Sequence, residues 1–293
     1  MPHFLLKKLM PACLLIQNQI IFDLDSCIKK DNETQYLEYI NQIINGKPLQ
    51  YITHEQEFMG FKFYVDENVL IPRPDTEILV EEVIKYCNEL RNNESEDKET
   101  NKDYKENIEK EPIINKEDKN INKKTIKILD LCTGSGAIAV SLAKYIKNVH
   151  ICAVDISSKA LEIAKKNAEL NGVKNNIEFI ESNLFDKIKE RKFDIIVSNP
   201  PYIETETIKT LSKDVQSEPK IALDGGKDGL DFYRKIADSG SKYLNRQGYI
   251  CLEIGYNQRI AVRQILENKK RYVNINCIKD LCGNDRVITA QIG

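Results

Sequence analysis

The chain has 293 residues, of which 41% are hydrophobic and 30% are charged, and its formal net charge is −2. This balance excludes a wholly disordered chain, a collagen-like fibre and a coiled-coil rod. The lack of a basic excess disfavours a protein that coats nucleic acid, because such proteins neutralise phosphates with many lysines and arginines.

The first fifteen residues, MPHFLLKKLMPACLL, mix positive charge with apolar side chains. Lys7, Lys8 and Pro11 interrupt the apolar run before it reaches the length of a signal peptide. The sequence contains no run of about 18 uncharged apolar residues, so we expect no membrane span and a cytoplasmic protein.

The region that follows predicts a few short elements. Apolar residues within 24–45 recur at helical spacing, and the aromatic residues within 51–70 alternate as in a hairpin. Two prolines then stiffen the chain, and Asp75 or Thr76 is expected to cap a helix that ends near Asn88.

Residues 91–124 differ in composition from the rest of the chain. Asn, Lys, Glu and Asp dominate this segment, and apolar periodicity is lacking. Such a sequence cannot bury enough apolar surface to offset the entropy of ordering, so we interpret it as a linker or surface insertion. A charged interaction tail is less favoured, because the acidic and basic residues nearly cancel.

Beyond the linker, stretches of strand and helix length alternate. We expect strands at 125–131, 150–154, 176–180, 193–198, 248–253, 273–278 and 286–292, and helices at 137–147, 158–171, 230–244 and 257–267. This alternation predicts an α/β fold with a mostly parallel sheet and helices on both faces. The last two strands are joined by a short link, so they should pair antiparallel. We predict a small helical N-terminal domain over residues 1–50, which would dock a substrate, and a hairpin with a connecting helix over residues 51–90. The linker then covers residues 91–124, and the α/β domain covers residues 125–293.

A glycine motif follows the first strand of the α/β domain and reads DLCTGSGAIAVSLA from Asp130. Gly134 and Gly136 allow a tight turn and let a ligand lie against the backbone. Asp155 ends the next strand, where its carboxylate can accept hydrogen bonds from ribose hydroxyls. The pattern predicts an adenosine-type cofactor, and by itself it also allows an NAD-dependent oxidoreductase.

A second motif follows the strand FDIIVS and consists of Asn199, Pro200, Pro201 and Tyr202. The two prolines remove backbone donors, which leaves the Asn199 side-chain oxygen and the Pro200 carbonyl as acceptors. Acceptors beside an aromatic ring suit a planar –NH2 group. We therefore predict that these four residues form a catalytic and substrate-binding site at the carboxyl end of the strand.

The two motifs together resemble those of amino-group methyltransferases that use S-adenosyl-L-methionine. Four further strings are similar to the release factor glutamine methyltransferases of the HemK/PrmC type: GKPLQYITHEQEF (46–58), LIPRPDTEILVE (70–81), EPKIALDGGKDGLDFYR (218–234) and GNDRV (283–287). The resemblance covers the chain from residue 46 to its end, apart from the linker. It implies a Rossmann-like class I methyltransferase sheet with an antiparallel final strand, plus a small helical N-terminal domain.

The resemblance also implies an activity: N5-methylation of the glutamine in the GGQ motif of class 1 peptide chain release factors. Asp155 would bind the ribose of S-adenosyl-L-methionine, Leu184 would border the adenine, and Asn199 would contact both cofactor and substrate. The residues that would surround the methionine part of the cofactor are Cys132, Thr133, Gly134, Ser135 and Gly136. The family commonly has a glycine where Cys132 stands and an acid where Asn183 stands.

The main alternative is an adenine-N6 methyltransferase acting on DNA or RNA, which presents the same –NH2 geometry on a flipped base. The near-neutral charge, the lack of an obvious target-recognition domain and the IPRPDTE string disfavour it. An oxidoreductase would leave the NPPY string without a role. We therefore expect a release factor as partner, with no membrane and no stable nucleic-acid partner.

The eight cysteines include no CxxC pair and only three histidines occur, so we expect no metal site.

Overall fold

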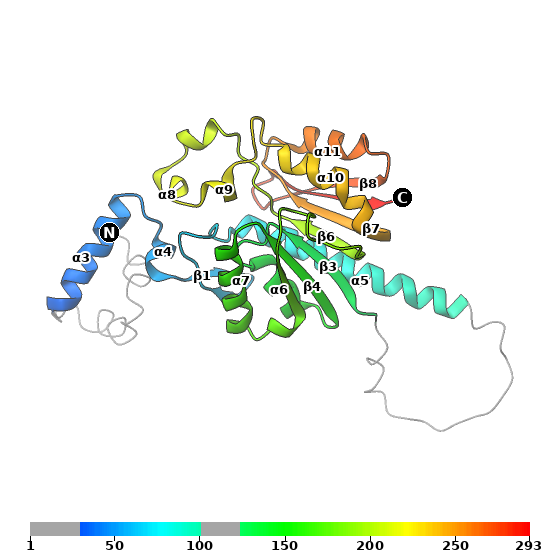
Figure 1. Cartoon of the computed structure of the whole chain (residues 1–293), viewed down its shortest axis with the longest axis horizontal. Helices are drawn as coiled ribbons and strands as arrows, with labels where there is room; N and C mark the ends of the chain where they lie inside the picture. Colours follow the sequence, from blue (N-terminus) through cyan, green and yellow to red (C-terminus); the bar gives the residue numbers. More distant parts are fainter. Residues whose placement is uncertain (1–29, 101–123) are drawn as a thin grey trace, which may run out of the picture.

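The computed structural model describes residues 30–100 and 124–293, and a seven-stranded sheet forms its centre (Figure 1). The strand order is β5-β4-β3-β6-β7-β9-β8. β3 to β7 pair in parallel, whereas β9 lies between β7 and β8 and is antiparallel to both. The predicted sheet with its antiparallel final strand is confirmed. The strands are β3 (Ile126–Leu131), β4 (Val149–Asp155), β5 (Ile177–Glu181), β6 (Phe193–Ser198), β7 (Leu244–Glu253), β8 (Tyr272–Lys279) and β9 (Asp285–Ile292).

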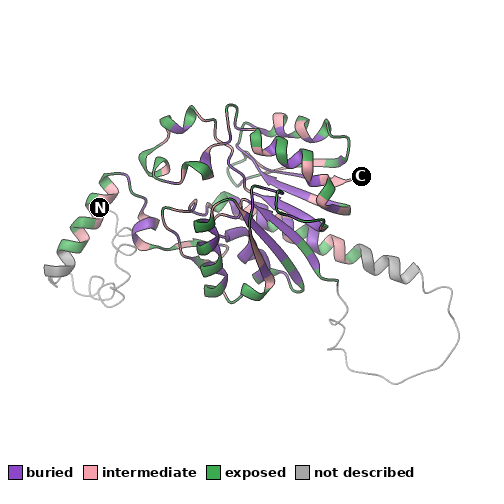
Figure 2. Cartoon of the chain, viewed as in Figure 1, coloured by how far each residue is buried: buried purple, intermediate pink, exposed green. Residues whose placement is uncertain are grey.

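Helices cover both faces of this sheet. Ile126 and Ile128 of β3 belong to a core with α5 and α6, while Leu129 and Leu131 belong to a second core with α10 and α11. Because both faces are buried, the strands carry nearly continuous apolar runs, and Figure 2 shows them as the buried centre. The long helices are α5 (Glu77–Thr100), α6 (Ala137–Tyr145), α7 (Ser158–Leu170), α10 (Asp231–Tyr243) and α11 (Arg259–Glu267).

The N-terminal part adds helices α3 (Lys30–Ile44) and α4 (Leu49–Thr53), and the predicted hairpin is present as β1 (Gln56–Phe58) and β2 (Phe61–Phe63). Asn167 on α7 ties the segment after the hairpin to the α/β domain. Its Oδ1 accepts from the Tyr64 N–H at 2.7 Å, and its Nδ2 donates to the carbonyls of Tyr64 and Ser135 at 3.0 and 2.9 Å.

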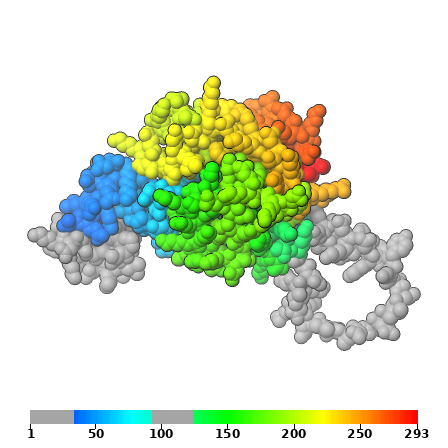
Figure 3. Space-filling view, viewed as in Figure 1, coloured from blue at the N-terminus to red at the C-terminus, as the bar shows by residue number. Residues whose placement is uncertain are grey.

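The segment between β6 and α10 carries three short helices that the sequence did not predict: η4 (Thr207–Thr210), α8 (Lys213–Gln216) and α9 (Lys220–Leu223). It borders the N-terminal part, since Ser217 Oγ donates to the Gly46 carbonyl at 3.0 Å. The space-filling view shows this yellow segment beside the blue and cyan residues (Figure 3).

The prediction that the helix after the prolines ends near Asn88 is wrong, because α5 continues to Thr100. The first ten residues of the predicted linker contain no Gly or Pro and include three Glu and one Lys, which favour helix continuation. Residues 101–123 of that linker, and the part of the N-terminal domain before Lys30, lie outside the described residues. Over the described ranges, no helix is both long and apolar enough to cross a membrane.

Candidate active site

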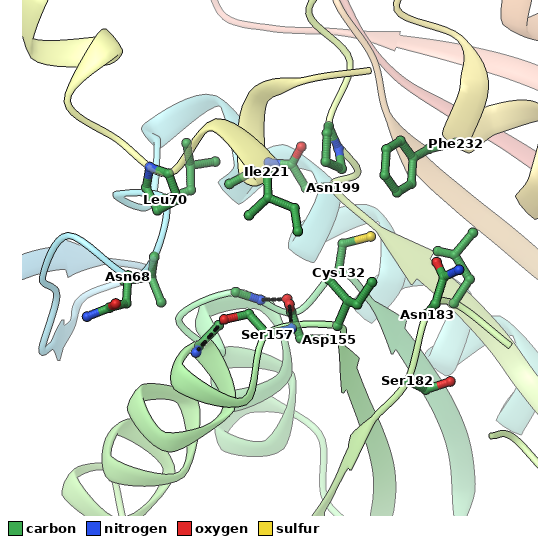
Figure 4. A pocket seen from close by; sticks show the side chains of 18 residues that line it. Asn68, Leu70, Cys132, Asp155, Ser157, Ser182, Asn183, Asn199, Ile221 and Phe232 are labelled. Atoms are coloured by element: carbon green, nitrogen blue, oxygen red, sulfur yellow. Dashed lines mark hydrogen bonds between the residues drawn. The ribbon is translucent and has the colours of Figure 1, made fainter. Parts of the chain in front are cut away.

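A cavity opens at the carboxyl ends of β3, β4 and β6, the edge where ligands bind in open α/β sheets (Figure 4). Asp155 and Ser157 lie on one side, Asn199 and Phe232 lie on the opposite side, and Cys132 lies between them. Twelve of the lining residues are Asn68, Leu70, Cys132, Gly134, Asp155, Ile156, Ser157, Asn183, Leu184, Asn199, Ile221 and Phe232.

The glycine loop between β3 and α6 forms the floor of this cavity. Gly136 has φ +79° at the start of α6, and a Cβ there would lie 3.0 Å from the Ala164 Cβ, so the loop requires glycine. Thr133 Oγ1 donates to Asp130 Oδ2 at 2.6 Å, which anchors the loop on the strand end. The predicted motif thus forms a tight turn packed against α7.

Asp155 ends β4, and its carboxylate joins two loops. Oδ2 accepts from the Gly134 N–H and Oδ1 accepts from the Ser157 N–H, both at 2.9 Å. Burial raises the pKa of Asp155, and these backbone hydrogen bonds oppose the rise. Each carboxylate oxygen can accept more than one hydrogen bond, so the residue can still receive ribose hydroxyls from the cavity.

Two non-glycine residues in the cavity wall have left-handed backbones: Cys132 with φ +59° and Leu184 with φ +49°. Such conformations cost free energy and cluster at functional sites. The glycine that the family resemblance places at Cys132 would adopt this φ without strain. Burial raises the pKa of the Cys132 thiol well above its ordinary value, so the side chain is neutral.

The NPPY residues separate this cavity from a second one. Asn199, Leu70 and Ala222 line both cavities, Pro201 lines the first, and Pro200 and Tyr202 line the second. The second cavity is also lined by Arg73, Ile203, Val215, Leu223 and Glu253. A third, smaller cavity shares Cys132, Gly134 and Asn199 and adds Thr133 and Ser135. Of the predicted site residues only Gly136 lines none of the three, because it forms the turn.

Contacts from other parts of the chain hold the NPPY residues. Asn199 Nδ2 donates to Thr76 Oγ1 at 3.2 Å, and Tyr202 Oη donates to Glu253 Oε1 at 3.4 Å. Gln258 Nε2 donates to the Tyr202 carbonyl at 2.9 Å. Burial raises the pKa of the Tyr202 hydroxyl, which is therefore neutral and a donor.

An ion pair between partly exposed Arg73 and buried Glu218 fixes the IPRP segment beside the second cavity. Arg73 pairs with Glu218, whose Oε2 also accepts from the Ile71 N–H at 3.0 Å. The sequence analysis assigned no role in the site to Arg73, Thr76 or Glu253, and considered Thr76 only as a candidate helix cap. Glu253 had a readable signal, since it is an acid at the carboxyl end of the otherwise apolar strand GYICLE.

Comparison with known proteins identifies a methyltransferase family. The family model described as "Methyltransferase small domain" matches residues 118–275. A release factor glutamine methyltransferase of Clostridium acetobutylicum is 42% identical over 91% of this chain and 82% of its own length. One of Clostridium botulinum is 38% identical over 93% of this chain and 85% of its own length. The solved hMettl16 catalytic domain, in complex with a 3'UTR hairpin, shares the fold with a TM-score of 0.56 at 15% identity, covering 84% of this chain and 82% of that one.

Proposed function

Because the chain belongs to the release factor glutamine methyltransferases, we propose that it methylates the N5 nitrogen of the glutamine in the GGQ motif of class 1 peptide chain release factors, with S-adenosyl-L-methionine as methyl donor. The methyltransferase domain match and the two adjoining cavities support this proposal. The α/β domain, residues 125–293, would carry out the methyl transfer, and the N-terminal part would help to present the release factor.

The chemistry of the first cavity fits the proposed cofactor. When bound, S-adenosyl-L-methionine supplies a methyl group on a positively charged sulfur. The Asp155 carboxylate suits the ribose hydroxyls, and the apolar side chains of Leu184 and Phe232 suit the faces of a purine. The glycine loop and Cys132 would surround the methionine part, and Asn183 would lie near the adenine.

The second cavity suits the glutamine side chain. An amide nitrogen is a poor nucleophile because its lone pair is delocalised, so its orientation matters more than a strong base. The Asn199 Oδ1 atom and the Pro200 carbonyl can accept its two N–H bonds, and Tyr202 can pack on the face of the amide. The lone pair would then face the first cavity, so positioning and acceptors aimed at the developing positive charge supply the rate acceleration.

The observation that carries the proposal is that Asn199 lines both cavities. The test is to incubate the protein with methyl-labelled S-adenosyl-L-methionine and, in parallel, a class 1 release factor, its Gln→Ala variant at the GGQ motif, and adenine-containing DNA and RNA. We expect label only in the unmodified release factor. Label in the nucleic acids, or equal label in both release factors, would overturn the proposal.

A protein partner also predicts a particular salt dependence. A complex dominated by phosphate contacts loses affinity steeply with salt, with a log–log slope of about −0.9 per phosphate neutralised. The chain has a net charge of −2, so we expect a much shallower dependence for the release factor. Methylation rates at several salt concentrations measure this slope.

A further inference from the structure

A buried glutamine joins the NPPY residues to the segment that follows β7. Gln258 stands at the N-cap of α11 and is 8% exposed, yet its side chain makes no capping hydrogen bond with that helix. It belongs to none of the strings that identified the site, and it lines none of the three cavities. A buried amide is costly unless its polar atoms are hydrogen-bonded, so its partners indicate its role.

The Gln258 carboxamide contacts three separate stretches of backbone. Its Nε2 donates to the carbonyls of Tyr202 and Gly229 at 2.9 and 3.2 Å. Its Oε1 accepts from the Gly255 N–H at 2.9 Å and lies 3.3 Å from the Tyr233 hydroxyl. Carbonyls can only accept and a backbone N–H can only donate, so these partners fix which end of the amide faces which way.

The backbone of Tyr202 is packed as closely on its other side. A Cβ at Gly229 would lie 2.4 Å from the Tyr202 carbonyl oxygen and 2.7 Å from Gln258 Nε2, and a Cβ at Gly225 would lie 2.7 Å from the Tyr202 Cα. Such distances are shorter than van der Waals contact, so only glycine fits at either position. The string DGGKDGL therefore serves as a glycine bed on which the end of the NPPY motif lies.

Tyr202 is thus held at both ends by the segment from β7 to α11. Its hydroxyl donates to Glu253 Oε1 at 3.4 Å, and its carbonyl accepts from Gln258. The ring between these two contacts lines the second cavity beside Asn199 and Pro200. Because the backbone contact is the shorter of the two, it limits where the ring can lie.

We propose that Gln258 is a positioning residue, which holds the backbone of Tyr202 so that the ring lies on the face of the substrate amide. This inference rests on the proposed function, because it concerns how the second cavity receives a glutamine. An in-line methyl transfer is sensitive to small displacements of the groups that orient the nucleophile. A carboxamide suits this place because it presents two donors to carbonyls and an acceptor to an N–H on one short side chain.

The first test is Gln258→Met, which keeps the length and neutrality of the side chain but removes its donors and its acceptor. We expect kcat for release factor methylation to fall by about ten- to a hundred-fold, as when an orienting group is displaced. The Kd for S-adenosyl-L-methionine should stay within about three-fold of wild type, because neither Gln258 nor Tyr202 lines the first cavity. Steady-state kinetics and titration calorimetry, below the melting temperature of the variant, measure the two effects.

Gln258→Glu is a second variant, for the case in which Gln258→Met does not fold. It retains an oxygen for the Gly255 N–H and removes the –NH2 group that faces Tyr202 and Gly229, so kcat should again fall. Gln264→Met is the matched control, since Gln264 is exposed on α11. The control should leave kcat, the Kd and the melting temperature unchanged.

A double-mutant cycle with Tyr202→Ala separates positioning from a merely structural role. Tyr202→Ala removes the ring and keeps the carbonyl that accepts from Gln258. If Gln258 acts through the ring, Gln258→Met should lower the melting temperature in both backgrounds but lower kcat only where the ring is present. The two losses in kcat should therefore not be additive.

The outcomes distinguish this inference from the proposed function. If wild-type protein leaves the release factor unlabelled, the proposed function fails first. If wild type labels it and either Gln258 variant retains the wild-type kcat, the positioning role alone is overturned. A loss in kcat of the same size with and without the Tyr202 ring would also overturn it, because Gln258 would then act on stability or on another part of the site.

Discussion

Replacing Asp155 by alanine tests the cofactor cavity most directly. The substitution removes the carboxylate that lines the cavity at the end of β4. Hydrogen bonds to charged groups contribute about 1.5–3 kcal/mol. At about 1.4 kcal/mol per ten-fold change, the Kd for S-adenosyl-L-methionine should rise by about 10- to 150-fold.

The structure adds a cost that concerns stability. The same carboxylate accepts the Gly134 and Ser157 N–H groups, so alanine leaves two backbone donors without these acceptors. Each loss should lower the free energy of unfolding by about 1 kcal/mol. Asp155→Asn is not a neutral substitute, because its –NH2 group would face one of these two donors.

Titration calorimetry with S-adenosyl-L-methionine and thermal unfolding measure the two effects separately. Glu162→Ala, an exposed acid on α7, is the control and should change neither quantity. A Kd for Asp155→Ala equal to that of wild type would refute the ribose assignment. A lower melting temperature with an unchanged Kd would assign the residue to the loop alone.

Three further substitutions test other parts of the site. Asn199→Ala should lower kcat far more than it weakens cofactor binding, because its oxygen acts mainly in the transition state; steady-state kinetics and calorimetry compare the two. Cys132→Gly relieves the strain of a backbone at φ +59° and should leave the melting temperature unchanged or higher. Cys132→Val places a β-branched side chain at the same φ and should lower the melting temperature. Arg73→Ala leaves Glu218 buried without its cation and should cost about 1–3 kcal/mol by urea unfolding, less than a fully buried pair because Arg73 is partly exposed.

The sheet and its motifs were predictable because their signals are local. Buried parallel strands read as short apolar runs, and a strand that ends in a glycine turn or in NPPY carries its own marker. Since the carboxyl ends of neighbouring parallel strands meet, Asp155 and Asn199 could be placed at one edge before the structure was known. The structure confirms that placement, and their chemical roles remain predictions.

The elements that the sequence analysis missed have only weak local sequence patterns. α8 and α9 have four residues each, about one helical turn, which is too short for a periodic pattern. The continuation of α5 to Thr100 escaped because its polar composition was interpreted as a linker. Polar residues without Gly or Pro are compatible with helix as well as with coil.

The contacts around Glu253 could not be predicted from the sequence, because they join residues that lie far apart in the chain. Thr76 and Asn199 are 123 positions apart, and Tyr202 and Glu253 are 51 apart. They meet because β6 and β7 are parallel neighbours, and because η2 (Pro74–Thr76) lies against their carboxyl ends before α5 begins. Each string marks a place on the chain, but only the fold determines which hydroxyl faces which carboxylate. The contacts of Asn199 with Thr76 and of Tyr202 with Glu253 are therefore properties of the assembled fold.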